Sequence, residues 1–291
     1  MGGNRRRKLY DPIMIRNTFI VLLISSIFTA CSHKKEEFSE QGVLWLLLSL
    51  SESDRAENYD RDVEILTHTS PPPYGNLYLD LNYSNGDIDY YIPLLKEQIT
   101  KYPKGYWIKA RTKKVYLAKY ILFRGGGAAR GFATPYIDDS LMLAINGIAT
   151  CNCDNEYIPT IHHELMHNVD FVRFGGTLLL SLPEWESLNY PGFKYGVLTP
   201  NAQWTELIHP LPGFVSYYST TNIMEDRAVM ASAIFGDVAL YANLLSWCST
   251  DSYLAQKVRR LASEMNQFWP FVVGENTFWK QRVSDVTNRC R

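Results

Sequence analysis

Residues 161–171 read Ile-His-His-Glu-Leu-Met-His-Asn-Val-Asp-Phe. His163 and His167 stand four positions apart, so on a helix both imidazoles project from the same face. Two nitrogens at this spacing can reach one zinc ion at about 2.0–2.1 Å. The apolar residues Leu165 and Val169 would bury the rest of the helix. This stretch therefore predicts a helix whose ligand face borders a cleft.

Glu164 follows the first of these histidines directly. On such a helix its carboxylate can accept a proton from a water molecule that the metal activates, which makes it the candidate general base. His162 lies about 100° around the helix from His163, so we expect it to be structural or to face a substrate. The alternative interpretation is a helix whose histidines are satisfied by carboxylates or backbone groups without any metal.

A third metal ligand must come from elsewhere in the chain, because a catalytic zinc site has three protein ligands and one open position. The extended metzincin pattern would need a histidine six residues after His167, where Arg173 stands, and that class is excluded. The remaining candidates are His209, Glu184, Glu186, Glu206 and Glu225.

Glu225 is favoured by its position at the start of a predicted helix. Asn222 would be the N-cap, and residues 228–235 are almost wholly apolar, which predicts a buried helix. A buried carboxylate needs a strong partner, and a zinc ion would be one. The alternative is a capping-box glutamate that bonds the backbone of Asn222.

Two segments carry a resemblance to a known family. The pattern Tyr-x-x-Thr-Asn-x-x-Glu at 218–225 and the pattern His-Glu-x-x-His-x-Val-Asp at 163–170 resemble motifs of the lethal-factor-type gluzincin metalloproteases. With the N-terminal segment described below, the chain is most similar to the zinc-binding metallopeptidase lipoproteins of gut-type bacteria. These substrate-import-associated metallohydrolases are often paired with outer-membrane uptake receptors. The resemblance covers residues from about 110 to about 240.

The resemblance implies one Zn²⁺ held by His163, His167 and Glu225, with Glu164 as general base. It also implies that Tyr218, or else Tyr217, assists the oxyanion; the alternative for either tyrosine is aromatic packing. The expected activity is hydrolysis of peptide bonds.

The chain departs from the family pattern at one position. Related enzymes often carry an acidic residue four positions after the ligand glutamate, where this chain has Val229. Asp170 is the candidate to orient a ligand histidine in its place, and the alternative is a surface or capping charge.

The sequence leaves two rival functions open. The first is a non-catalytic surface lipoprotein that binds glycan or peptide beside an outer-membrane uptake receptor. Its metal site would be structural, closed by a fourth ligand such as His209 or a cysteine. The second is zinc-dependent hydrolysis of an amide or ester that is not a peptide bond.

The N-terminus predicts a bacterial lipoprotein signal peptide over residues 1–30. Arginines and a lysine at 5–8 precede an apolar run at 18–30, which is shorter than the roughly 20 residues that span a bilayer. The ending Phe-Thr-Ala-Cys31 resembles a lipobox, so we expect Cys31 to be lipidated and the chain to be anchored at the outer membrane or cell surface. An uncleaved anchor or a plain secretory signal are the alternatives, and both also place the chain outside the cytoplasm.

Four further cysteines follow in the expected oxidising compartment. Cys151 and Cys153 stand so close in sequence that we do not expect them to pair with each other. Pairing of one of them with Cys248 or Cys290 is left open, and a Cys-x-Cys metal site is the alternative.

Composition and pattern predict an α+β fold. A formal net charge of −1 excludes a global basic field for nucleic acid, and 46% hydrophobic residues fit a globular core. We expect strands at 76–83, 114–123 and 140–145, a helix at 88–102, a short apolar element at 43–50, and mostly helices from 158 onward. Gly125 to Gly127 predict a turn, not a dinucleotide fingerprint.

The predicted architecture is a small N-terminal sheet packed on a mostly helical, zincin-type catalytic domain. The expected parts are the signal peptide at 1–30, a tether and N-terminal segment at 31–75, and a metallohydrolase domain at 76–291. The predicted partners are a peptide or protein substrate, the membrane through the lipid, and an uptake receptor complex, with no nucleic acid.

Overall fold

The computed structural model of the chain describes residues 54–176, 181–196 and 206–291. Residues 55–291 form one compact unit. The predicted signal peptide, the lipidated Cys31 and the predicted apolar element at 43–50 lie outside the described residues. The division into a tether at 31–75 and a catalytic domain at 76–291 stays a prediction.

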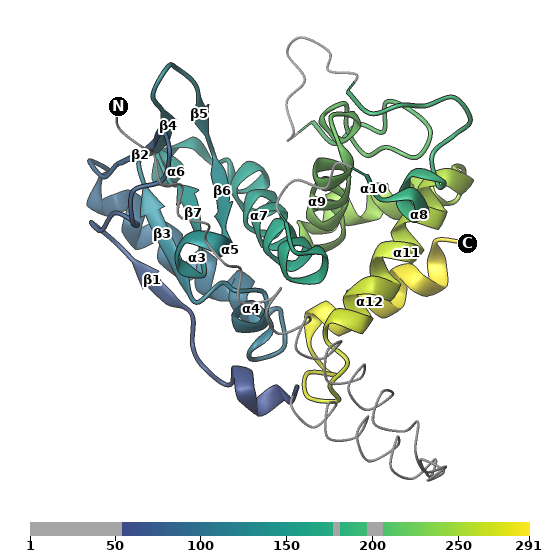
Figure 1. The fold of residues 1–291 in the computed structure, drawn as a ribbon, viewed down its shortest axis with the longest axis horizontal. Helices are drawn as coiled ribbons and strands as arrows, with labels where there is room; N and C mark the ends of the chain where they lie inside the picture. The colour runs from purple at the N-terminus through teal and green to yellow at the C-terminus, as the bar shows by residue number, and fades with distance from the viewer. Residues whose placement is uncertain (1–53, 177–180, 197–205) are drawn as a thin grey trace, which may run out of the picture. The chain divides into compact units, whose positions relative to one another are not determined.

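The fold is mixed, with small sheets followed by a helical region, as the α+β prediction required (Figure 1). In chain order the elements are η1 (Ala56–Tyr59), β1 (Glu64–Leu66), β2 (Leu77–Asp80), α3 (Asn85–Thr100), α4 (Tyr106–Lys109), β3 (Lys114–Ala118), β4 (Tyr120–Phe123), β5 (Ala128–Ala129), β6 (Gly131–Thr134), α5 (Pro135–Asp138), β7 (Ser140–Ala144), α6 (Ile148–Cys151), α7 (Asp154–Phe174), α8 (Pro183–Glu186), η2 (Tyr218–Thr220), α9 (Ile223–Phe235), α10 (Val238–Cys248), α11 (Ser252–Phe268) and α12 (Phe278–Arg289).

Two small sheets make up the N-terminal half. The first has the strand order β1-β3-β7-β6, in which β1, β3 and β7 are parallel and β6 runs antiparallel along the edge. The second, β2-β4-β5, is wholly antiparallel. Every residue of β7 is buried, which fits an apolar central strand covered on both faces.

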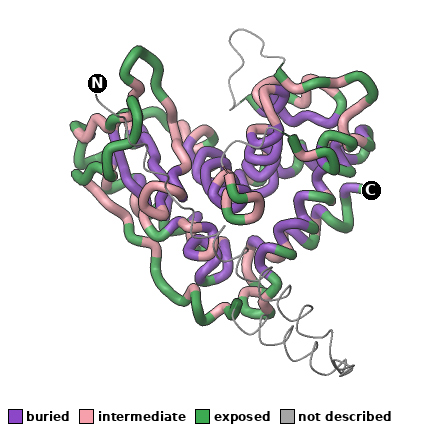
Figure 2. The backbone as a smooth tube through the Cα atoms, viewed as in Figure 1, coloured by how far each residue is buried: buried purple, intermediate pink, exposed green. Residues whose placement is uncertain are grey.

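Helix α7 packs against β6 and β7 on one side and against α9 on the other (Figure 1). Figure 2 shows that buried positions concentrate in these central elements, while the turn between β4 and β5 is exposed. One apolar core joins α3, α7 and the C-terminal helices, and a smaller one lies around Tyr116, Ile121 and Met142 near the second sheet. The fold therefore holds α7 between a sheet edge and α9.

The strand prediction for 114–123 was wrong in one respect. The segment is not one strand but two, β3 and β4, which belong to different sheets and meet at Lys119. Both halves are apolar, so the sequence pattern alone does not reveal the break. The predicted elements at 76–83, 88–102 and 140–145 correspond to β2, α3 and β7, and the glycines at 125–127 form the tip between β4 and β5, each at positive φ.

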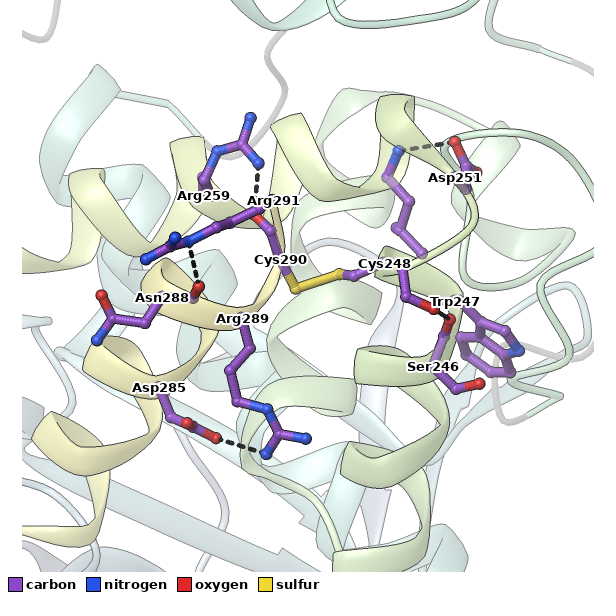
Figure 3. Close-up of a disulfide and its surroundings, with 12 residues drawn as sticks. Ser246, Trp247, Cys248, Asp251, Arg259, Asp285, Asn288, Arg289, Cys290 and Arg291 are labelled. Carbon is purple, nitrogen blue, oxygen red and sulfur yellow. Dashed lines mark hydrogen bonds and ion pairs between the residues drawn. A yellow bond between two sulfur atoms is a disulfide. The ribbon is translucent and has the colours of Figure 1, made fainter.

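The expectation that Cys151 and Cys153 do not pair with each other was also wrong. They form a disulfide, and the Cα atoms lie 5.2 Å apart because Asn152 between them adopts a left-handed conformation with φ 51°. The spacing of the two cysteines in the sequence does not predict this local turn. A second disulfide, Cys248–Cys290, joins the end of α10 to the residue after α12, and Arg259 of α11 donates a hydrogen bond to the Cys290 carbonyl (Figure 3).

Among the described residues, no single helix is long and apolar enough to cross a membrane, although α9 and α10 pass that test together, with a 116° bend between them.

Candidate metal centre

Helix α7, which carries His163 and His167, is fixed to the sheet by Asn168, the residue after His167. The Asn168 side chain donates to the Thr112 hydroxyl at 2.7 Å and to the Ser140 carbonyl at 3.1 Å, both in the buried interior. Gly175 ends the helix in a left-handed conformation with φ 77°, as a C-terminal glycine commonly does. The helix is therefore held in register against β7, and its other face turns toward α9.

Three potential metal ligands converge between α7 and α9. The Nε2 atoms of His163 and His167 lie 3.0 Å apart, and Glu225 Oε2 lies 3.1 Å from the first and 3.5 Å from the second. All three side chains are largely withdrawn from solvent, with exposures of 6%, 13% and 18%. These residues form a group that can hold a metal ion.

The spacing of these atoms fits a small tetrahedral cation. A tetrahedral zinc ion with bonds of about 2.0–2.1 Å would hold its ligand atoms about 3.3 Å apart. The observed separations, 3.0, 3.1 and 3.5 Å, bracket that value. Two nitrogens and one carboxylate oxygen are also a ligand set that zinc accepts.

The electrostatics of the group favour a positive charge among the three atoms. Burial alone would lower the pKa of His167, but Glu225, Glu164 and Asp170 together outweigh burial and raise it to about 9. Burial alone would raise the pKa of Glu225, yet the two histidines hold it well below its usual value. Either a proton or a metal cation can supply the positive charge that these atoms favour. Because the two compete for the same atoms, we expect metal binding to release protons.

Asn222 fixes Glu225 in place. Its side chain caps α9 and accepts a hydrogen bond from the Glu225 backbone N–H at 2.9 Å, which confirms the predicted N-cap. The Glu225 carboxylate itself faces the two histidines, so the capping-box alternative for this side chain does not describe its contacts.

Glu164 lies against the edge strand β6. The residue is 7% exposed, and its carboxylate accepts a backbone hydrogen bond from Ala133. Burial raises its pKa, an effect that Glu225 reinforces and the two histidines oppose. A carboxylate with a raised pKa can take up and release a proton nearer to neutral pH.

The side chain of Glu164 occupies the space next to Gly131 that the Cβ of any other residue would fill. A Cβ at Gly131 would lie 2.6 Å from Glu164 Oε1 and 2.7 Å from Cδ, closer than atoms in side-chain contact can approach. The packing of the carboxylate on β6 therefore depends on a residue without a side chain. Sequence reasoning did not single out this glycine, because its φ is ordinary and only the tertiary contact makes it necessary.

Tyr218 stands beside the metal group, on η2. Its ring centroid lies 6.3 Å from that of His163. Burial, together with the negative charges of Glu225 and Glu164, raises the pKa of Tyr218, so the phenol remains a hydrogen-bond donor. Tyr217, the alternative, is half-buried and is not among the residues that line the cavity described next.

One cavity of about 520 Å³ brings these groups together. It is lined by Tyr74, Phe123, Ala128, Ala129, Gly131, Phe132, Ala133, Tyr136, His163, Glu164, His167, Tyr218, Asn222, Met224 and Glu225. The candidate base, the candidate oxyanion donor and the three candidate ligands thus share one solvent-connected space.

The other candidate third ligands lie elsewhere. His209 bonds Asp251 through Nε2 at 2.8 Å and stacks on Trp247. Glu184 pairs with Arg260, and Glu186 accepts from the Leu182 backbone N–H at 2.9 Å. Glu206 is exposed. Within the described part of the chain, Glu225 is the only one of the five that meets His163 and His167.

His162 has a structural environment. It is buried, its Nδ1 lies 2.9 Å from the Tyr102 hydroxyl, and its Nε2 lies 3.3 Å from Gln98 Oε1. Burial lowers its pKa to about 3, so the ring stays neutral. Of the two roles expected for this residue, the contacts favour the structural one.

Asp170 contacts an arginine, not a ligand histidine. Its two carboxylate oxygens accept from Arg227 Nε and Nη2, each at 2.8 Å, and both side chains are fully buried. Arg227 Nη2 also pairs with Glu264 at 2.8 Å. Among the described residues no hydrogen bond joins Asp170 to His163 or His167. The ion pair instead ties α7 to α9, the two helices that carry the candidate ligands.

Three consecutive charged residues therefore open the apolar helix α9, each with its own partner. Glu225 faces the histidines and Arg227 holds Asp170, while Asp226 Oδ2 accepts from Lys257, Trp185 and Tyr195 at 2.8–2.9 Å. Sequence reasoning missed Asp226 and Arg227. The available signal was their position in a helix predicted to be buried, where every charge needs a partner.

Comparison with known proteins found no matching family, no matching curated protein and no matching solved structure. The family resemblance of the two motifs therefore stays a prediction, and the geometry of the site supports the function proposed for the chain.

Proposed function

We propose that this chain is a zinc-dependent metallopeptidase of the bacterial cell envelope. One observation carries the proposal: His163, His167 and Glu225 converge at zinc-like spacing in a cavity that Glu164 and Tyr218 also line. A bound zinc ion would supply Lewis-acid chemistry and lower the pKa of water toward neutrality.

The side chains around this centre have complementary roles in peptide hydrolysis. Glu164, with its raised pKa, takes a proton from the attacking water and transfers it to the leaving amine. Tyr218, whose raised pKa keeps the phenol protonated, donates a hydrogen bond to the oxygen that gains negative charge. Among the described residues, β7 is the one strand paired with β6, and Gly131, Phe132 and Ala133 of β6 line the cavity together with Glu164.

The geometry favours catalysis over the rival of a closed structural metal site. Such a site would have a fourth protein ligand. In the part of the chain that the structure describes, no further histidine, cysteine or acid joins the group. His209 is paired with Asp251, and the four described cysteines are in disulfides.

The decisive variant is Glu164→Gln. It should bind zinc as the original chain does, but lose roughly 10²- to 10⁴-fold in the rate of cleavage of a peptide library, because the general base is removed. Glu156→Gln is the matched control, since Glu156 lies on the same helix but outside the cavity. Cleavage by Glu164→Gln at the original rate would contradict the proposal.

The substrate assignment can be tested in the same preparation. Hydrolysis of simple amides or esters without any peptide cleavage would replace the peptidase assignment with the broader hydrolase. Zinc binding without any hydrolysis would favour the binding lipoprotein.

The cellular location is proposed from the N-terminal sequence alone. We expect Cys31 to carry the lipid that anchors the chain at the outer membrane or cell surface, where an uptake receptor complex would be its neighbour. Labelling with a radioactive or clickable fatty acid should mark the original chain and not Cys31→Ser. Equal labelling of both would contradict the anchor.

A further inference from the structure

Four aromatic side chains, together termed the aromatic wall, line the cavity and stay partly exposed. Tyr74 is 42% exposed, and Phe123, Phe132 and Tyr136 are half-buried. They come from the segment before β2, the end of β4, the middle of β6 and the start of α5. Scattered exposed aromatics need no explanation, but several rings lining one cavity are typical of a ligand site.

The rings are arranged in two pairs. The Phe123 and Phe132 centroids lie 5.7 Å apart at 67°, and those of Tyr74 and Tyr136 lie 5.2 Å apart at 60°. Both arrangements are the edge-to-face kind that aromatic pairs prefer, so the wall is preformed. The ring centroids of Tyr136 and Phe171 of α7 lie 5.9 Å apart, so this side of the wall packs against the helix that carries His163 and His167.

The wall contains no charged side chain that could pair with a charged group of a ligand. Burial and the neighbouring Tyr74 hydroxyl raise the pKa of Tyr136, which keeps it neutral. Apart from the histidines and glutamates of the proposed catalytic centre, the described lining of the cavity contains no lysine, arginine or aspartate. A charged side chain would lose hydration here without gaining a partner, whereas an apolar ring would displace water from apolar surface.

The wall also lies next to the proposed point of cleavage. Successive residues of a strand project to opposite faces, so Phe132 points away from the side on which Gly131 meets Glu164, and its ring meets Phe123. Adjacent side chains of an extended peptide also project to opposite sides, so a substrate whose backbone passes Glu164 can place a neighbouring side chain on the Phe132 side. We propose that Tyr74, Phe123, Phe132 and Tyr136 form a subsite for an aromatic or large aliphatic side chain of a peptide substrate. This inference rests on the proposed peptidase function, whose catalytic centre shares the cavity.

Binding to an inactive chain tests the subsite without any need for catalysis. The mature chain carrying Glu164→Gln is titrated calorimetrically with blocked five-residue alanine peptides that have phenylalanine, alanine or lysine at the centre. The uniform flanks let each peptide shift its register until the central side chain reaches the wall. The phenylalanine peptide should bind roughly ten-fold tighter or more than the others, within the 10- to 200-fold range that apolar pockets achieve.

Two further substitutions locate the effect. Phe132→Ala should remove most of the preference for phenylalanine, and Tyr74→Ala, a change at an exposed ring, should reduce it without disturbing the core. Tyr120→Ala is the matched control, because Tyr120 is an exposed ring on β4 that does not line the cavity. It should leave the preference unchanged.

Each outcome decides one of the two proposals. Equal affinity for the three peptides, including no detectable binding of any, overturns the subsite, as does tighter binding of an oligosaccharide than of the phenylalanine peptide. A preference for phenylalanine in Glu164→Gln supports the subsite even if the original chain cleaves no peptide, and that second result would overturn the peptidase function alone.

Discussion

Replacement of Gly131 by alanine should separate catalysis from metal binding. The new Cβ would stand 2.6 Å from Glu164 Oε1, whereas ordinary contact begins at 3.4 Å. The carboxylate must therefore retreat by about 0.8 Å (3.4 − 2.6). A displacement of about 1 Å at a reacting group can cost roughly 100-fold in rate. The three atoms nearest to this Cβ all belong to Glu164, so we expect the zinc affinity of His163, His167 and Glu225 to change by only a few fold.

The assay pairs two measurements on each purified variant. Zinc affinity is measured by chelator competition, and kcat/KM is measured on whichever library peptide the original chain cleaves best. Gly86→Ala is the control, since its Cβ would meet Ser84 Oγ at 3.8 Å and Ala149 Cβ at 3.9 Å, both ordinary contacts. Full activity in Gly131→Ala, or loss of activity in proportion to lost zinc, would refute the positioning of Glu164 by β6.

Three further predictions concern what holds the centre in place. Arg227→Met should lower the free energy of unfolding by about 3–5 kcal/mol in urea titration, because it leaves the Asp170 carboxylate buried without its arginine partner, whereas Glu264 keeps Arg173 and Arg260; a loss below about 1 kcal/mol would contradict this. Cys290→Ser opens a loop with a sequence separation of 42 and should cost about 4 kcal/mol, against about 2 kcal/mol for Cys153→Ser, where the separation is 2; equal losses in non-reducing melts would count against the loop argument. Burial would raise the pKa of Asp251, but the hydrogen bonds it accepts lower it below 3.8, so its stabilising contribution is complete above that pH and is lost as the pH falls further. The difference in unfolding free energy between the original chain and Asp251→Asn should therefore shrink from about pH 5 to about pH 3, and a constant difference would contradict the sign.

The helix of the two histidines and the third candidate ligand could be predicted because local rules determine them. The spacing of His163 and His167 requires one helical face, and the Asn222 cap followed by an apolar helix predicts a buried Glu225 in need of a partner. In the structure the three side chains meet as that reasoning anticipates. Each of these two inferences used only the sequence around a single helix and, for Glu225, the free-energy cost of burying a charge.

The features that escaped prediction depend on contacts between distant segments. Asp170 was expected to orient a histidine, yet its partner is Arg227 on another helix, and no local pattern links the two. The break at Lys119 places two apolar strands in different sheets, which periodicity cannot distinguish from one strand. The turn at Asn152 that pairs Cys151 with Cys153 is a backbone conformation that spacing does not encode.

The most direct test of the central claim is the zinc content and zinc-edge X-ray absorption of the purified mature chain. We predict one zinc per chain, with two imidazole nitrogens and a carboxylate oxygen at about 2.0–2.2 Å, and loss of that zinc in Glu225→Ala but not in Glu156→Ala. Absence of tightly bound zinc, sulfur among its ligands, or unchanged zinc in Glu225→Ala would contradict a metal centre built from His163, His167 and Glu225.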